Sequence, residues 1–596
     1  MITDKPVLAH NKEPELTQEI RLKGAPASRG YAIGPAFLFK RDIINIDYRT
    51  IAPEEAEEEK DKFRKSIEQS NKELIKISTI THQKLGEEFS AIFDAQIMML
   101  FDPEITKIII REIEQSNFTA EAATDKAFNQ QIELLKAAAT DSYLAQRITD
   151  LEDVKFRIIR NLQRGKLLSH VEDSSVIVAD NLTPADMILF SRQNIVGIVL
   201  DFGGLTSHVA LIARSLNIPL VIGLHKISGV VKNGDEVIVD GIDGIAIARP
   251  APNILEKYHK KMEKFRKFIS IFENDINEPA ITLDGKRINV LANIEFRDEI
   301  GDMGICGAEG IGLYRTEHLF LSRGYFPSED HQFKYYSSLF DLAQAWPVTI
   351  RAFDVGGDKV LESSFHEMNP FLGWRGIRIM LDRPDIFKNQ IRAILRASVG
   401  KNVKLMFPMI HNLTQVHQIK ELMEEIYTEL DKKDIPYKKI PVGVMIEVPS
   451  AVMVSEEIAR EVAFFSIGTN DLTQYTLAVD RGNDIISSLY KELEPAVIRL
   501  IDKTIQSGHL SNIPVSICGE LGSNILATPL LIGMGIDDIS VVIRRVPEVK
   551  YIIKNLRESD CVKLKNEVLK LGTVAEVEAR LKSWLTEHMP QFSGYI

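Results

Sequence analysis

The hydrophobic pattern of the chain changes from strands to helices, returns to strands, and then becomes an alternation of the two. Between about residues 53 and 164, apolar side chains recur at steps of three, four and seven, as in Phe63, Ile67, Leu74 and Ile77. This is the spacing of one face of an α-helix. Further helices are expected over residues 92–104, 120–139 and 142–167. We therefore predict a four-helix bundle over residues 53–165.

Short apolar runs on either side of the bundle predict a small α/β domain. Strands are expected over residues 175–179 and 195–200, and a hairpin over residues 236–248, where the pattern alternates around a glycine turn. These runs predict one discontinuous domain, 24–52 and 166–250, into which the bundle is inserted. Residues 1–23 have no clear period and are expected to form a flexible extension. A charged, amphipathic linker helix is expected within residues 251–278.

The second half of the chain, residues 279–596, alternates strand and helix patterns over some three hundred residues. This alternation predicts a C-terminal (β/α)8 barrel. Its strands are expected at residues 287–293, 310–314, 348–353, 403–409, 442–446, 464–467, 515–517 and 539–542. The complete fold class is thus an α/β multidomain protein with a helical bundle, a linker helix and a TIM barrel.

The amino-acid composition limits the classes of protein to which this chain can belong. Of 596 residues, 45% are hydrophobic and 26% charged, as in ordinary globular proteins of several domains. The net charge of −12 argues against nucleic-acid binding and suits a basic partner protein. Three cysteines make no disulfide framework, which fits a reducing cytoplasm. No apolar run reaches transmembrane length, so we expect a cytoplasmic protein without membrane insertion.

His208 is the most distinctive candidate for chemistry. It follows the strand at 195–200 and the turn Gly203-Gly204, and it lies in the first turn of a short helix. Free N–H groups and the positive end of the helix dipole at this place attract phosphate and disfavour a charged imidazolium. A neutral imidazole can act as a nucleophile. Taken singly, such a histidine is more often a structural residue near a helix cap.

A second group of candidates follows the predicted barrel strands. In barrels of this kind the chemistry lies where the strands end. Two carboxylates at neighbouring strand ends suit Mg²⁺, and arginines beside them suit a phosphate and a carboxylate. The pattern therefore predicts a pocket for a small, anionic phosphorylated acid, although each residue alone also has a structural interpretation. The candidates are Arg315, Arg351, Glu447, Asn470, Asp471, Arg481 and Cys518.

Longer motifs carry a specific resemblance. The stretches 203–214, 307–317, 369–375, 464–481 and 518–520 resemble Enzyme I of the bacterial phosphoenolpyruvate:sugar phosphotransferase system, within the PEP-utilizing enzyme family. The resemblance runs from about residue 24 to the C-terminus. It implies a phosphoenolpyruvate-protein phosphotransferase in which a swivelling domain carries a phosphohistidine. The phosphoryl group would pass from phosphoenolpyruvate to a histidine-containing phosphocarrier protein (HPr), releasing pyruvate, as the first step of sugar transport.

The resemblance also implies roles for the candidates. His208 would be phosphorylated, and Cys518 would protonate the enolate. Glu447 and Asp471 would bind Mg²⁺. The phosphoenolpyruvate ligands would be Arg315, Arg351, Asn470, Asp471 and Arg481, with Arg375 as a weaker candidate for the phosphate. The bundle would dock the phosphocarrier, although the pattern alone favours a scaffold, and the barrel would form a homodimer.

Three positions depart from the pattern of the resembled family. Gln96 stands where many relatives have histidine, Leu205 replaces a basic residue, and His318 replaces an apolar one.

Two other functions compete with the phosphotransferase interpretation. A dikinase or phosphoenolpyruvate synthase would need a nucleotide-binding domain before the histidine domain, and the bundle offers no glycine-rich phosphate loop. A phosphoenolpyruvate sensor would be expected to lack His208, Glu447 or Asp471. Thr183 has two open interpretations, a phosphoryl ligand or a helix cap.

Overall fold

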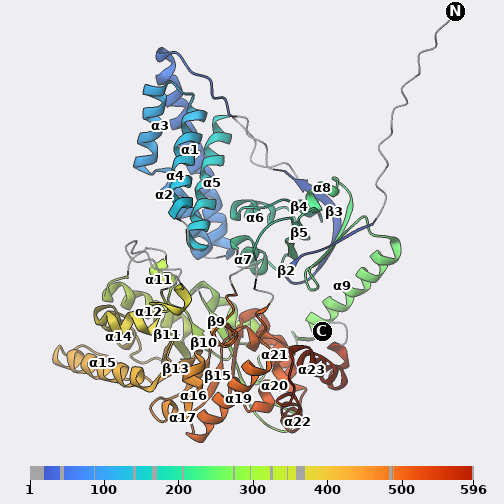
Figure 1. The fold of residues 1–596 in the computed structure, drawn as a ribbon, viewed down its shortest axis with the longest axis vertical. Helices are drawn as coiled ribbons and strands as arrows, with labels where there is room; N and C mark the ends of the chain where they lie inside the picture. The colour runs from blue at the N-terminus through green and yellow to red at the C-terminus, as the bar shows by residue number, and fades with distance from the viewer. Residues whose placement is uncertain are drawn as a thin grey trace, which may run out of the picture. The chain divides into compact units, whose positions relative to one another are not determined.

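The computed structural model divides into two compact units, residues 1–267 and 268–596, and each is described by itself (Figure 1). The residues that the structure describes are 19–40, 46–85, 87–138, 142–163, 171–204, 207–272, 276–295, 297–321, 326–344, 346–356, 369–481, 486 and 489–592. Most of the expected N-terminal extension, together with Leu205 and Thr206, therefore lies outside the described residues.

The first unit contains a mixed sheet of eight strands in the order β1-β8-β7-β3-β4-β5-β6-β2. The strands are β1 Ile20–Lys23, β2 Ala25–Ser28, β3 Tyr31–Phe39, β4 Val176–Ala179, β5 Gly197–Leu200, β6 Leu220–Ile222, β7 Glu236–Asp240 and β8 Ile245–Ala248. The predicted hairpin is confirmed, since β7 and β8 pair antiparallel. The prediction that the flexible extension runs to residue 23 is wrong for its last four residues. Ile20–Lys23 pairs antiparallel with β8, so this segment belongs to the sheet.

The helical region consists of five helices in the described residues, rather than the four that the pattern predicted. They are α1 Ala56–Leu85, α2 Glu87–Leu100, α3 Pro103–Ser116, α4 Ala120–Ala138 and α5 Ser142–Leu162. The break before α3 has a local cause, because Asp102 caps its backbone N–H groups and Pro103 occupies its first position. Ile105, Ile109 and Ile113 then form one buried face at steps of four.

Four further helices complete this part of the chain: α6 Pro184–Phe190, α7 His208–Ser215, α8 Ile227–Val230 and α9 Pro252–Phe272. The linker helix α9 is tied to the sheet at its N-terminal half. The Tyr258 hydroxyl donates a hydrogen bond of 3.0 Å to the buried carboxylate of Asp240, at the end of β7. Lys261 lies 3.3 Å from the same carboxylate. This half of the helix is therefore part of the first unit.

The second unit is built on a closed barrel of eight parallel strands, as predicted. The strands are β9 Asn289–Ile294, β10 Ile311–Tyr314, β11 Val348–Arg351, β12 Val403–Phe407, β13 Val442–Ile446, β14 Phe465–Ile467, β15 Val515–Ile517 and β16 Asp538–Val542. Two strands end earlier than expected, β11 before Phe353 and β12 before Met409. At Met409 the backbone turns into the left-handed region, with φ of 59°, which an extended strand cannot continue.

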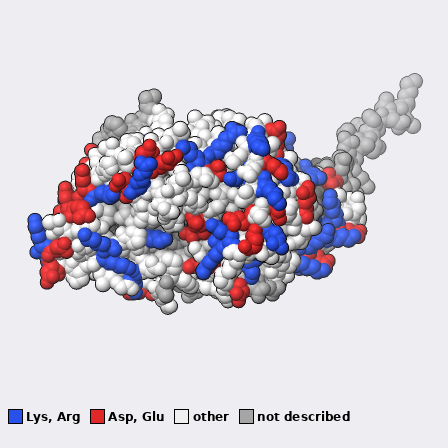
Figure 2. Space-filling model, turned by 90° about the horizontal axis from the view of Figure 1, so that it is seen from below, with Lys and Arg blue, Asp and Glu red and all other residues white. Residues whose placement is uncertain are grey.

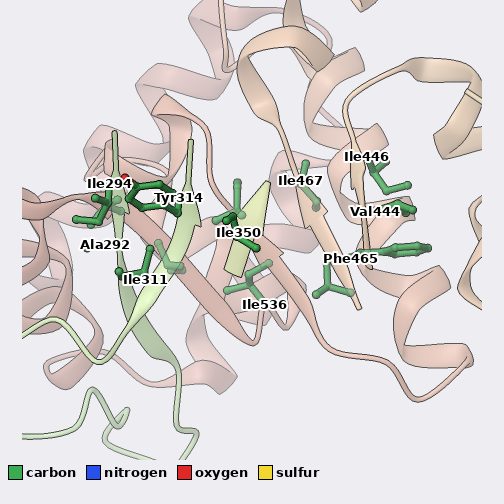
Figure 3. Packing of buried hydrophobic residues seen from close by; sticks show 14 of the residues in the cluster. Ala292, Ile294, Ile311, Tyr314, Ile350, Val444, Ile446, Phe465, Ile467 and Ile536 are labelled. Atoms are coloured by element: carbon green, nitrogen blue, oxygen red, sulfur yellow. The ribbon is translucent and has the colours of Figure 1, made fainter. Parts of the chain in front are cut away.

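Helices surround this barrel and bury the outward face of its strands. They are α10 Ile300–Cys306, α11 His318–Leu321, α12 Glu329–Ala343, α13 Ile377–Asp382, α14 Pro384–Ala397, α15 Leu413–Lys432, α16 Pro449–Met453, α17 Ser455–Ala459, α18 Thr469–Leu477, α19 Pro495–Leu510, α20 Thr528–Met534, α21 Val546–Lys554, α22 Glu558–Val568 and α23 Val574–His588. Figure 3 shows residues of this core, including Ile350, Val444, Ile446, Phe465 and Ile467. Because side chains alternate along a strand, the intervening residues face the barrel interior.

The surface carries charges of both signs. Lys and Arg side chains are interspersed with Asp and Glu over the face shown in Figure 2. Among the described helices, none is both long and apolar enough to cross a membrane.

Candidate active site

His208 is the first residue of α7, and the chain reaches it from β5 through a glycine turn. Gly203 has φ of 138°, a conformation that favours glycine. Ser207 is the N-cap, and its hydroxyl accepts a hydrogen bond of 3.3 Å from the N–H of Ala210. The start of a helix offers N–H groups without helical partners, which attract an anion. The predicted place of His208 is therefore confirmed.

The environment of His208 favours the neutral imidazole. Burial lowers the pKa of His208, because a charged imidazolium loses solvation there. The strand end before it is held firmly by Asp201, whose buried carboxylate accepts hydrogen bonds from Ile227 N and Ser228 N at 2.6 and 3.1 Å. A neutral nitrogen on a fixed helix start is suited to attack an electrophilic phosphorus.

Thr183 is a helix cap. Its Oγ1 accepts a hydrogen bond from Asp186 N and donates one of 2.8 Å to the Asp186 carboxylate, a capping box at the start of α6. Of the two roles expected for Thr183, the structure confirms this one.

In the second unit, Arg351 is the last residue of β11 and lies in a buried ion-pair network. Its Nη2 is 2.9 Å from Glu317 Oε1, and its Nη1 is 3.4 Å from Asp354 Oδ2. Its Nη1 also lies 3.8 Å from the sulfur of Met445, a neighbour on β13. Burial alone would lower the pKa of Arg351, but the carboxylates of Glu317 and Asp354 outweigh it and raise the pKa. The guanidinium therefore stays charged.

Arg375 extends this network to Asp471. Its Nη2 is 2.8 Å from Asp354 Oδ2 and 3.1 Å from Asp471 Oδ2, and its Nε donates to Asp354 Oδ1 at 3.3 Å. Its Nη1 donates to the Tyr475 hydroxyl at 3.2 Å. Sequence reasoning offered Arg375 as a phosphate ligand, whereas the structure surrounds it with protein carboxylates.

Glu447 follows β13 directly and is 1% exposed. Its Oε1 accepts a hydrogen bond of 2.6 Å from the N–H of Met409. A Cβ at residue 468 would lie 2.8 Å from Glu447 Oε2, so glycine at this position leaves room for the carboxylate. Burial first, and then the negative charges of Asp471 and Asp354, raise the pKa of Glu447 to about 8.

The charges of this buried group suit a divalent cation. Two arginines, Arg351 and Arg375, face four carboxylates, and all six residues are at most 9% exposed. The carboxylates are Glu317, Asp354, Glu447 and Asp471. When all are ionised, the group has an excess of two negative charges, which Mg²⁺ would neutralise.

The carboxylate oxygens point to the same cation. Asp471 Oδ1 is buried and has no hydrogen-bond partner among the described residues. The described residues hold no group of three or more His, Cys, Asp or Glu that could bind a metal. Mg²⁺ commonly uses one or two carboxylates and completes its shell with water and substrate oxygens. The pair Glu447 and Asp471 therefore fits it.

Cys518 lies directly after β15, in the barrel interior, and is 3% exposed. It packs with Leu313, Met406 and Met445 from three other strands. Burial raises the pKa of the Cys518 thiol to about 11, although the hydrogen bond from Ser466 acts in the opposite direction. The sulfur thus carries a proton at neutral pH, as an acid must.

Three other candidates lie in more exposed positions around the same strand ends. Arg315 follows β10, and its Nη1 is 3.2 Å from Glu295 Oε2. Asn470 is on the first turn of α18, and its Oδ1 accepts from Glu520 N at 2.8 Å. Arg481 is exposed. These polar side chains are accessible to a ligand at the strand ends.

Sequence reasoning missed the carboxylates that organise the arginines. Glu317 and Asp354 each accept hydrogen bonds in the network, and neither was singled out. Their signal was present in the sequence, since Glu317 comes shortly after β10 and Asp354 shortly after β11. An acidic residue two or three positions after an arginine is too common to be informative without the fold.

Comparison with known proteins agrees with this architecture. Three family models match in succession: the PEP-utilising enzyme, N-terminal domain over residues 23–147, the mobile domain over 171–244 and the PEP-binding domain over 272–558. Relatives called phosphoenolpyruvate-protein phosphotransferase cover almost the whole chain. Those from Bacillus sp. (strain S) and Geobacillus stearothermophilus are 37% and 38% identical, each over 95% of this chain and 98% of the relative. The Haemophilus influenzae relative is 36% identical over 95% of this chain and 99% of its own.

The chain belongs to the phosphoenolpyruvate-protein phosphotransferase family. The resemblance to Enzyme I seen in the motifs is thereby confirmed. His208 falls within the family's mobile domain, and the barrel-end network falls within its PEP-binding domain.

Two of the three departures from the family can be placed in the structure. Gln96 is 1% exposed, and its Nε2 donates to Asp150 Oδ1 at 3.1 Å, joining α2 to α5. His318 begins α11 and packs against the rings of Tyr314 and Tyr335. Burial lowers the pKa of His318, so a neutral ring is favoured among these aromatic neighbours.

Proposed function

We propose that this protein is a phosphoenolpyruvate-protein phosphotransferase that passes the phosphoryl group through His208 to a histidine-containing phosphocarrier protein (HPr), releasing pyruvate. The observation that carries the proposal is His208 itself, a histidine with a lowered pKa at the first position of α7 in the family's mobile domain. Transfer to HPr would be the first step of sugar uptake by the phosphotransferase system.

Phosphoenolpyruvate would bind at the carboxyl ends of the barrel strands. Arg315, Arg351, Asn470 and Arg481 offer donors for its phosphate and carboxylate, and arginine binds both groups bidentately. Glu447 and Asp471 would hold Mg²⁺. When bound there, Mg²⁺ supplies electrostatic stabilisation of the charge that develops on the phosphate and enolate oxygens. The excess of two negative charges that the buried network has when all its carboxylates are ionised supports this assignment.

The chain's own residues then account for the transfer. A neutral nitrogen of His208, Nε2 by family likeness, attacks phosphorus in line, and a P–N bond forms as the P–O bond to the enol oxygen breaks. The electron pair of that bond stays on the enolate. The thiol of Cys518 donates its proton to the methylene carbon of the enolate, giving pyruvate, and the thiolate recovers a proton from water. A thiol with a pKa of about 11 holds its proton until the enolate forms.

The bundle would receive the phosphocarrier. Ile75 on α1 and Met98 on α2 are 49% and 69% exposed, and exposed apolar side chains of this kind suit a protein partner. We further propose, from family likeness, a cytoplasmic homodimer joined through the barrel domain, with no nucleic-acid partner. The phosphohistidine would then pass its phosphoryl group to the histidine of the carrier.

The test is incubation of the full chain with ³²P-labelled phosphoenolpyruvate and Mg²⁺, with and without HPr. We expect an acid-labile, base-stable label on the protein that HPr removes. His208→Ala should abolish the label and still bind phosphoenolpyruvate, whereas His259→Ala, an exposed histidine on α9, should behave as the wild type. Label persisting in His208→Ala would refute the assignment. Label from ATP would instead favour a dikinase, and binding without any label would favour a sensor.

A further inference from the structure

Arg375 lies between the two parts of the barrel-end network, and all three nitrogens of its guanidinium already contact protein. Nε and Nη2 bind Asp354, Nη2 also binds Asp471, and Nη1 binds the Tyr475 hydroxyl. Tyr475 in turn donates a hydrogen bond of 2.5 Å to the carbonyl of Phe371. The Arg375 side chain is 9% exposed. A phosphate would have to displace these contacts to reach it.

The backbone of Arg375 is also closely confined. Residues 356 and 375 form an isolated antiparallel bridge, and a Cβ at residue 356 would lie 2.3 Å from the Arg375 Cα. Gly356 has φ of 136°, and Gly376 has φ of 56°. A Cβ at residue 376 would lie 2.9 Å from Asp354 Oδ1. Glycines on both sides therefore let this arginine approach Asp354 closely.

We propose that Arg375 is a positioning residue, which orients Asp471 for the metal and links it through Asp354 to the substrate arginine Arg351. The proposal rests on the assignment of Asp471 as a Mg²⁺ ligand under the proposed function. It deepens that assignment, because it gives a fixed role to a residue that the sequence suggested as a phosphate ligand.

The two oxygens of Asp471 support this role. Oδ2 is held by Arg375 at 3.1 Å, whereas Oδ1 is buried without a hydrogen-bond partner among the described residues. A carboxylate held by one oxygen presents the other in a fixed direction, as the outer partners of metal ligands commonly do. Arg375 therefore leaves Oδ1 as the oxygen available to a cation.

Asp354 makes the link to the substrate side. Its Oδ2 lies 2.8 Å from Arg375 Nη2 and 3.4 Å from Arg351 Nη1, so one carboxylate oxygen is shared between the two guanidinium groups. Its backbone N–H donates to Glu317 Oε1 at 3.0 Å, the same oxygen that binds Arg351. A shift of either arginine would therefore alter the position of the other. Metal binding and substrate binding are expected to be coupled through this carboxylate.

The experiment measures Mn²⁺ binding to the full chain by the electron paramagnetic resonance signal of free Mn²⁺, with and without pyruvate. Arg375→Gln should weaken Mn²⁺ binding by about 10- to 100-fold, the usual effect of removing an outer partner of a metal ligand. Arg375→Lys should have a smaller effect, since a lysine keeps the charge but cannot hold both carboxylates. Asp354→Asn should weaken Mn²⁺ binding and also raise the KM for phosphoenolpyruvate. Arg383→Gln, which removes an exposed ion pair with Asp385, is the matched control and should leave Mn²⁺ binding unchanged.

Two results would overturn the proposal, and they are distinguishable. If Arg375→Gln binds Mn²⁺ like the wild type and only raises the KM for phosphoenolpyruvate, Arg375 is a direct phosphate ligand. If Asp471→Asn also leaves Mn²⁺ binding unchanged, the metal assignment itself fails. The melting temperature of each variant checks folding. If Arg375→Gln does not fold, Arg375→Lys tests the positioning role instead. A wild-type Mn²⁺ affinity in Arg375→Lys would refute that role.

Discussion

The hydroxyl of Ser466 donates a hydrogen bond of 3.2 Å to the sulfur of Cys518, across two neighbouring strands of the barrel. The thiol is buried among apolar side chains, and its pKa is raised to about 11. The Cys518 sulfur is therefore protonated and lies at the strand ends. The charges of Glu447 and Arg351 also affect its pKa, which the first raises and the second lowers.

Cys518→Ala is expected to slow pyruvate formation by about 10²- to 10⁴-fold, the usual contribution of a positioned acid. Binding of phosphoenolpyruvate should change little, because the arginines and carboxylates remain. Pyruvate release, followed by a coupled assay, and calorimetric binding separate the two effects. Cys306→Ala, on the half-buried cysteine that ends α10, serves as the control. An unchanged turnover in Cys518→Ala would show that another group supplies the proton.

The lowered pKa of His208 predicts the acidic limit of phosphorylation. The attacking imidazole must be neutral, and burial keeps it neutral at pH values where an exposed histidine, with a pKa near 6.5, is already charged. The rate of a single phosphorylation turnover should therefore fall to half its plateau only at a pH below about 6.5. The ring signals of His208 in an NMR titration measure this directly. A midpoint at or above about 6.5 would contradict the prediction.

A buried ion-pair group should hold the bundle together. Glu73 on α1 accepts hydrogen bonds from both Arg157 and Arg160 on α5, and Glu73 and Arg157 are 8% and 4% exposed. Glu73→Gln would remove the carboxylate that Arg157 and Arg160 share and leave the buried Arg157 with Asp153, at 4.0 Å, as its only ion-pair partner among the described residues. We expect the opening free energy of α1 and α5 to fall by about 3–5 kcal/mol, measured by native-state hydrogen exchange. Asp61→Asn breaks only an exposed pair with Arg64 and should cost less than about 1 kcal/mol. Equal losses in the two variants would disprove the argument.

The contact of Gln96 with Asp150 predicts a pH dependence of bundle stability. Burial raises the pKa of Asp150 to about 6, while the hydrogen bond from Gln96 lowers it in part. An unfolded aspartate titrates near 3.9, so the folded chain holds this proton more tightly. The stabilisation is complete below the unfolded pKa and is lost as the pH rises through about 6.

Between pH 5 and pH 8 we therefore expect a loss of about 1–2 kcal/mol in the opening free energy of α2 and α5. Hydrogen exchange at the two pH values measures it. Asp150→Asn should remove this part of the pH dependence, and Asp94→Asn, a carboxylate that accepts an exposed hydrogen bond from Ser78, should not. A wild-type pH profile in Asp150→Asn would place the dependence elsewhere.

Much of this molecule was predictable from local pattern. The period of the apolar residues identified four of the five helices of the bundle, the hairpin at 236–248 and all eight barrel strands, because helix and strand repeats are properties of short segments. The strand ends followed from the same reasoning, since the carboxyl ends of parallel strands meet at one end of a barrel. Arg351, Glu447 and Cys518 were therefore predicted from the strand ends, and His208 from the helix start that follows the strand at 195–200.

The pairing of side chains was decided only by the tertiary structure. Arg375 and Asp471 are separated by 96 positions, and nothing local shows that one guanidinium reaches both Asp471 and Asp354. The strand Ile20–Lys23 was missed for the same reason, since its partner β8 lies at the far end of the domain. Sequence period determines which face of an element is buried. The closing of the sheet and of the barrel determines which buried charges meet, because that depends on contacts between segments remote along the chain.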